Sequence, residues 1–191
     1  MKKWFAYGGV AASIVLVAFG IGAIGIGIAG LNDVRDEIAE QNIVAGDDAP
    51  ALTDGRLESG QAIKTGADAR AFADVMEAHT LESTEGKRYA EMGRFLTPSG
   101  EDTSDEALAA KTEDGRPVEN GLRNMWVTET ALTTALNTAF FAERVAFFSI
   151  VMGVALLLTG IGFLVLTLGG ALGWVALPRR SKSLSTASAA T

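Results

Sequence analysis

The sequence of 191 residues contains no cysteine and a single histidine, His79. Without cysteine, the chain has no disulfide framework, no thiol nucleophile and no zinc site of the Cys/His type. One histidine also excludes any metal site within the chain that needs two, and a Ser-His-Asp arrangement would have to use His79. No Gly-x-Ser-x-Gly turn accompanies it. We therefore expect no catalytic residue, no cofactor and no bound metal, and interpret His79 as a structural residue near a helix end.

Charge is absent from two long stretches, residues 4–31 and 145–178, and all 23 acidic residues lie between them. A helix needs roughly 20 apolar residues to cross a bilayer, and only helices and closed barrels satisfy their backbone in lipid. The first stretch is also longer than the apolar region of a cleaved signal peptide. The sequence therefore predicts an all-α fold built on a transmembrane helical hairpin, with spans at 8–31 and 145–170. The lack of a basic patch excludes a nucleic-acid partner.

The basic residues outside the central segment predict the orientation of the hairpin. They flank the two apolar stretches and give +5, whereas residues 32–144 carry −12. Because basic flanks stay in the cytoplasm, we expect a multi-pass protein of the cell membrane with both termini inside. The expected parts are a cytoplasmic N-terminus (1–7), an acidic helical extracytoplasmic domain (32–144), and an inner-interface segment with a disordered cytoplasmic tail (171–191), besides the two spans.

Small residues are frequent in the first span, and they predict a helix-packing face. The expected face consists of Ala18, Gly22, Gly25 and Ala29. Small residues let helix backbones approach closely in lipid, where packing drives association. Two interpretations stay open: this face packs on the second span of the same chain, or it packs on a partner membrane protein or a second copy. Neither span contains an ionisable residue, which argues against an ion pathway through this chain alone.

Residues 32–144 hold only 25 apolar side chains larger than alanine, so the sequence predicts a modest helical core. Because Val34 and Ile38 lie on one helical face, the first span is expected to continue outward for two or three turns, followed by a loop at 46–60. The spacing then predicts a helix over 59–81, with Gly66 as an alternative start. One long helix is expected to begin near Asn120 and to run into the second span. Between them, the apolar cluster of Tyr89, Met92, Phe95 and Leu96 predicts a turn or two of helix that ends before Pro98. Residues 98–117 are expected to be a mobile loop or to contain a short exposed helix over 104–111.

Five larger side chains are the candidates for the centre of this domain, namely Phe72, Met76, Tyr89, Phe95 and Trp126. They are interpreted either as its hydrophobic core or as the lining of a concave apolar pocket. The acidic clusters at 47–48 and 101–106 lack the ligand spacing of a calcium loop and are interpreted as solvated loops.

Three runs of the sequence resemble an actinobacterial family of small two-pass membrane proteins of unknown function. They are LNDVRDEIAEQNIV, GQAIKTGADARAFADVMEAHTLESTEGKRYAEM and WVTETALTTALNTAFFAERVAFFSIVMGVALLLTGIGF, and the resemblance covers most of residues 31–163. It implies a bacterial cell membrane and a shared architecture, and it supplies no site residues. Some relatives carry a label as aromatic ring-opening dioxygenases. That label does not fit this chain, because a facial-triad iron site needs two histidines.

These features favour a non-enzymatic accessory or interaction subunit of a cell-envelope complex, whose partners are the lipid bilayer and a membrane protein or a second copy. The alternative is an extracytoplasmic ligand-binding or sensing module, which requires a pocket among the five large side chains. A membrane-anchored hydrolase that uses unassigned carboxylates is a third option.

Overall fold

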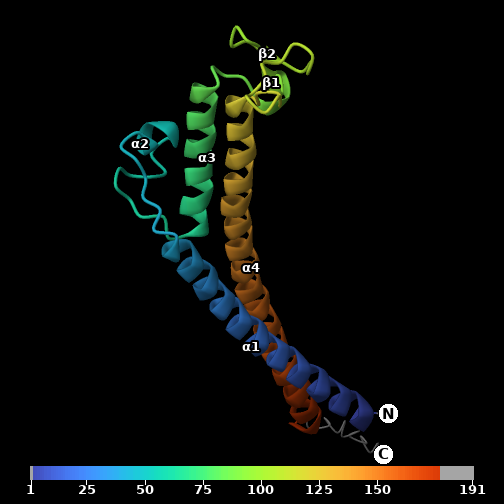
Figure 1. The fold of residues 1–191 in the computed structure, drawn as a ribbon. Helices are drawn as coiled ribbons and strands as arrows, with labels where there is room; N and C mark the ends of the chain where they lie inside the picture. The colour runs from blue at the N-terminus through green and yellow to red at the C-terminus, as the bar shows by residue number, and fades with distance from the viewer. Residues whose placement is uncertain (1, 177–191) are drawn as a thin grey trace, which may run out of the picture. The chain divides into compact units, whose positions relative to one another are not determined.

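The computed structural model describes residues 2–176, and the chain is about two-thirds helical. Figure 1 shows the elements in chain order. They are α1 (Lys2–Glu40), α2 (Ala49–Leu52), α3 (Gly66–Ser83), a 3₁₀ turn at Tyr89–Glu91, β1 (Phe95–Leu96), β2 (Asp102–Thr103) and α4 (Gly121–Ala176). Of the expected inner-interface segment and cytoplasmic tail (171–191), residues 177–191 lie outside the described residues. The chain divides into two compact units, which we call the helical pair (2–25 with 151–176) and the central unit (26–150).

In the helical pair, α1 and α4 approach through glycine. A Cβ atom built on Gly20 would lie 2.7 Å from the carbonyl oxygen of Gly153 and from the backbone nitrogen of Leu157. At Gly160, a Cβ would lie 2.9 Å from the backbone nitrogen of Val17. Contacts to backbone atoms cannot be relieved by a rotamer change, so this pairing requires glycine at both helices.

The expected packing face of the first span is therefore not the face that contacts α4. Ala18, Gly22, Gly25 and Ala29 are all exposed, and a Cβ built on Gly22 or Gly25 meets nothing within 4 Å. The contacts to α4 come from a neighbouring face that includes Gly20 and, within the central unit, Gly27. Small residues are frequent all around this helix, so composition alone did not distinguish the two faces.

Both long helices contain segments that are long and apolar enough to cross a membrane, Ala6–Glu40 and Gly121–Gly170. Only 11% of the most apolar window in each is buried. Phe19 is 69% exposed and Leu166 is 73% exposed, for example. Monomeric soluble proteins rarely expose contiguous apolar surface of this extent, so these segments have the surface of helices that are surrounded by lipid or by other protein.

In the central unit, α3 lies alongside α4, and the end of α1 packs near both (Figure 1). The expected outward extension of the first span is confirmed, since α1 runs unbroken to Glu40, and one helix from Gly121 onward is confirmed as α4. The core consists of small and medium apolar residues, and Leu57, Ile63 and Val75 are at most 2% exposed. Its other buried members are Ile38, Ala45, Ala49, Ala69 and Ala71.

The α3 helix begins at the alternative start, Gly66. Thr65 is the N-cap, and its hydroxyl accepts a hydrogen bond from the backbone N–H of Asp68 (3.1 Å). The Asp68 carboxylate accepts in return from the backbone N–H of Thr65 (3.0 Å), which completes a capping box. Such a reciprocal cap fixes a helix start more strongly than apolar spacing does, and the expected start at 59 is wrong for that reason. The preceding segment is not loop throughout, because it contains the single turn of α2.

Residues 93–120 differ most from the expectation. The expected helical turn is present only as the 3₁₀ turn at Tyr89–Glu91, whereas Phe95 lies in β1, paired antiparallel with Thr103 of β2. No helix forms over 104–111; backbone hydrogen bonds join this stretch to its neighbours instead, as from Ala110 N to Leu96 O and from Val118 N to Ala110 O. Glycine permits this compact arrangement, because a Cβ on Gly93 would collide with the backbone of Thr103. The two-residue strands are too short to leave an alternating pattern in the sequence.

Candidate functional site

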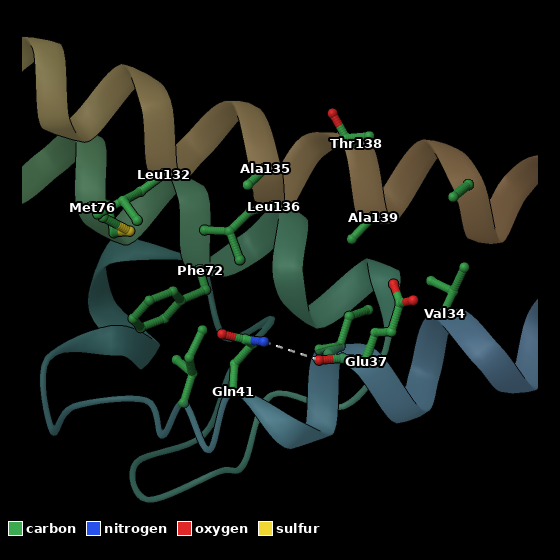
Figure 2. Close-up of a pocket in the computed structure, with 13 residues that line it drawn as sticks. Val34, Glu37, Gln41, Phe72, Met76, Leu132, Ala135, Leu136, Thr138 and Ala139 are labelled. Carbon is green, nitrogen blue, oxygen red and sulfur yellow. Dashed lines mark hydrogen bonds between the residues drawn. The ribbon is translucent and has the colours of Figure 1, made fainter.

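An apolar groove of about 750 Å³ lies within the central unit, between the end of α1, α3 and α4 (Figure 2). Two helices contribute residues that lie on one helical face and line the sides of the groove. They are residues 34, 37, 38 and 41 of α1, and Phe72 and Met76, which are four residues apart on α3. Ten of the thirteen lining residues are apolar. They are Val34, Ile38, Ile43, Phe72, Met76, Leu132, Ala135, Leu136, Ala139 and Ala142, and the polar ones are Glu37, Gln41 and Thr138. Ligand pockets have this volume range and this mixture of many apolar and few polar groups.

The floor of the groove is part of the hydrophobic core, whereas its rim is open. Ile38 is 6% exposed, and Phe72 and Leu136 are partly buried against the core. At the rim, Leu132 is 48% exposed. The alanines of α4 keep the space free, because Ala135 and Ala139 present only methyl groups to it. The groove is therefore a depression in a packed unit, and its shape depends on how the three helices are held.

One buried carboxylate holds all three helices. Glu143 of α4 accepts a hydrogen bond from Arg35 Nε of α1 (2.7 Å) and another from the backbone N–H of Gly66, the first residue of α3 (3.1 Å). Its side chain is 10% exposed, against 47% for Arg35. A carboxylate at a helix N-terminus also interacts favourably with the helix dipole. A Cβ on Gly66 would lie 2.8 Å from the Cα of Phe140, so only glycine allows this close approach.

Exposed polar contacts join the segment between α1 and α3 to the side of α3. His79 Nε2 lies 2.5 Å from Asp48 Oδ2, and Arg56 Nη2 lies 2.8 Å from Asp74 Oδ2. The hydrogen bond from His79 lowers the pKa of Asp48 below its ordinary value of 3.8. The single histidine thus has a structural contact near the end of α3. Within the described residues, no group of three or more His, Asp or Glu side chains is arranged to hold a metal ion.

Among the residues that the structure describes, Glu37 is the only charged one that lines the groove. Figure 2 shows its carboxylate directed from α1 towards α4. Among the side chains that the structure describes, no cation forms an ion pair with it. Gln41, one turn further, donates a long hydrogen bond of 3.5 Å to the backbone carbonyl of Glu37, which leaves the carboxylate oxygens open. The groove therefore presents an apolar surface with one negative group.

The five large side chains singled out in the sequence fall into two groups. Phe72 and Met76 line the groove. The other three lie near the first turns of α4, each with an arginine over its ring. Arg88 lies 5.7 Å from the ring centre of Trp126, Arg94 5.3 Å from that of Phe95, and Arg123 3.8 Å from that of Tyr89.

In this second cluster, Trp126 is 5% exposed and its indole N–H donates to the carbonyl oxygen of Lys87 (2.9 Å). Asn120 begins α4 as its cap: its side-chain oxygen accepts from the backbone N–H of Leu122 (3.1 Å), and its amide nitrogen donates to Gly93 O (3.0 Å). The cluster fastens residues 87–120 to α4 and contributes nothing to the groove.

Sequence reasoning did not identify Glu37 or the alanines of α4 as lining residues. An acidic residue in a helix of an acidic segment is unremarkable, and alanine fits any helical environment. The one available signal was the spacing of Leu132 and Leu136 on the expected long helix, which marked a buried stripe without showing what faces it.

Comparison with protein-family models, with curated proteins and with solved structures finds no match for this chain.

Proposed function

We propose that the chain is an integral membrane protein that crosses the bilayer twice, with both termini in the cytoplasm and residues 32–144 outside. Two observations support the crossing: the apolar segments of α1 and α4 are long enough, and most of their apolar surface is exposed. The orientation is supported by charge, since the flanks carry +5 and the segment between them −12. This architecture is also the one that the resemblance to two-pass actinobacterial proteins implies.

The function that the geometry supports best is binding of an apolar or amphiphilic ligand by the extracytoplasmic part. The observation that carries this proposal is the groove of about 750 Å³, lined by ten apolar residues and held by a buried carboxylate. Interaction with a partner was the first expectation from the sequence. The groove supports binding of a ligand more directly than interaction with a partner, because a partner needs no cavity.

The test is to narrow the groove and to measure binding of an amphiphile. Ala135 lines the groove and is exposed, so Ala135→Trp fills space with little strain on the core. Ala131 is exposed one turn earlier on α4 and does not line the groove, and Ala131→Trp is the matched control. An amphiphile with a photoreactive group in its alkyl chain should label the wild type and Ala131→Trp saturably, at peptides of α3 and α4. Labelling of Ala135→Trp should be reduced. Equal labelling of Ala135→Trp would contradict the proposal.

A second candidate, the accessory or interaction subunit, is favoured by the exposed small-residue face of α1. In the helical pair, α4 occupies the face with Gly20, and Gly22 and Gly25 remain free of neighbours within 4 Å. This absence of contacts holds for a Cβ built on either glycine and for the part of the chain that the structure describes. Such a face allows another helix to approach closely in lipid. Gly22→Leu should then abolish self-association or co-purification of a partner from mild detergent. A wild-type protein that is monomeric and alone in mild detergent would contradict this candidate.

A further inference from the structure

The groove has a definite place along the two long helices. The lining residues closest to the two apolar runs are Val34 and Ala142. Val34 lies three residues after Leu31, where the first run ends, and Ala142 lies three residues before Val145, where the second run begins. At 1.5 Å per residue, this corresponds to about 5 Å of helix. If the apolar runs fill the hydrocarbon core, the near end of the groove lies in the headgroup layer, which adds roughly 5 to 8 Å on each side. Molecules of the membrane itself therefore reach the groove without crossing water.

The charge of the groove discriminates among such molecules. Among the described residues, Glu37 is the one ionisable side chain that lines it, and it differs from Glu143 in its hydrogen-bond partners. Glu143 accepts two hydrogen bonds, one from a guanidinium, whereas the oxygens of Glu37 face open space next to an apolar wall. The whole segment around it carries −12. An anionic head group would be repelled at this position, and a cationic one would gain an ion pair.

We propose that the groove binds a membrane lipid that bears an amine head group. The alkyl chain lies along Phe72, Met76 and Leu136, and the ammonium group pairs with the Glu37 carboxylate. This proposal rests on the proposed ligand-binding function and adds the chemical class of the ligand. Its two parts, chain and head group, are tested by different substitutions.

The experiment uses the full chain in nanodiscs of phosphatidylcholine, whose head group has no net charge. Three photoreactive probes share one alkyl chain and differ only in the head group, which is an amine, a hydroxyl or a carboxylate. Labelling is measured against the mole fraction of each probe, and the labelled peptides are located by mass spectrometry. One favourable charge contact at a solvated site corresponds to about fivefold in affinity. The amine probe should therefore half-saturate at about one-fifth of the mole fraction that the hydroxyl probe needs.

Two variants separate the head group from a general attraction to acidic protein. Glu37→Gln should bring the amine and hydroxyl probes to equal labelling while labelling of the groove continues. Asp36→Asn removes an exposed acid that does not line the groove, and it should leave the fivefold preference intact. Folding of each variant is checked by the amide-exchange protection of α3.

The outcomes distinguish the two proposals. Groove labelling that is equal for all three probes, or that favours the carboxylate, overturns the amine lipid and leaves ligand binding in place. The same holds if Asp36→Asn abolishes the preference as fully as Glu37→Gln does. The absence of saturable labelling at the groove, or labelling that Ala135→Trp does not reduce, overturns both.

Discussion

The same two helices, α1 and α4, are joined by different contacts in the two units. In the helical pair they meet through Gly20 and Gly153, where backbone lies against backbone. In the central unit the close contact continues at Gly27, where a Cβ would lie 2.8 Å from the carbonyl oxygen of Ala146, and Arg35 and Glu143 add an ion pair, with α3 joined through Gly66. Close packing suits a lipid environment, in which burying apolar surface gives no advantage between helices. Charged hydrogen bonds suit a region near water, where an ion pair is half solvated. The change of contact along the helices thus follows the expected change of solvent.

The largest loss of stability is expected from a substitution at Gly20 in the helical pair. Gly20→Leu places a side chain against backbone atoms of Gly153 and Leu157, which can yield only if the helices separate. Overpacking of this kind costs typically 1–3 kcal/mol and occasionally more, and we expect about 3 kcal/mol here. The free energy of unfolding in mild detergent measures it. Gly22→Leu is the matched control, because nothing lies within 4 Å of its Cβ, and it should change the intrachain stability little.

In the central unit, the substitution Glu143→Gln should weaken the contacts that join α1, α3 and α4. The amide keeps the shape but loses the charge that Arg35 and the N-terminus of α3 stabilise. Hydrogen bonds to charged groups contribute about 1.5–3 kcal/mol, and partial exposure of Arg35 places the expected loss near the lower end. Amide exchange should accelerate in the first turn of α3, while the helical pair stays protected. Glu40→Gln, at an exposed position of α1, is the control. A uniform loss of protection in both units would contradict the separate roles.

A smaller effect is expected at the start of α3. Thr65→Ala removes the hydroxyl that caps the helix and should cost about 1 kcal/mol. Thr134→Ala, on the exposed side of α4, is the comparison. Thr65 caps the first turn of α3, and Glu143 binds the backbone N–H of Gly66 in the same turn. The costs of Thr65→Ala and Glu143→Gln should therefore not add up when the two are combined. Strict additivity in a double-mutant cycle would show that the two contacts act independently.

The smallest effect is a pH dependence at Asp48. Because the bond from His79 lowers its pKa in the folded chain, the charged carboxylate stabilises the fold above its ordinary pKa of 3.8. That contribution is lost as the pH falls below about 4 and through the lowered pKa. The stability difference between wild type and Asp48→Asn should therefore shrink over this acid range. A difference that stays constant down to pH 2 would mean that the contact with His79 contributes nothing.

The features that the sequence predicted correctly are those that depend on a pattern over many residues. Two apolar runs predicted α1 and α4, and the extension of α1 to Glu40 followed from Val34 and Ile38 on one face. The sequence did not show which face of α1 meets α4, because glycines at 20, 22, 25 and 27 look alike until the partner helix is in place. Within residues 93–120, the helical turn expected at Phe95 and the alternative helix over 104–111 were wrong, since the structure there depends on hydrogen bonds between short segments. Glu143 was only weakly indicated by the sequence. An acidic residue between Phe141 and Val145 is expected to have a basic or hydrogen-bonding partner, but Arg35 is too far away in the chain for the sequence to identify it.

The most direct test concerns the two crossings, on which the placement of the groove depends. The chain has no cysteine, so a single introduced one is a unique label. Ser104→Cys lies at an exposed position between α3 and α4, and Ser183→Cys follows the second apolar run. In intact cells, a membrane-impermeant maleimide should label Ser104→Cys and should label Ser183→Cys only after permeabilisation. Labelling of both in intact cells, or of Ser183→Cys alone, would contradict two crossings with residues 32–144 outside.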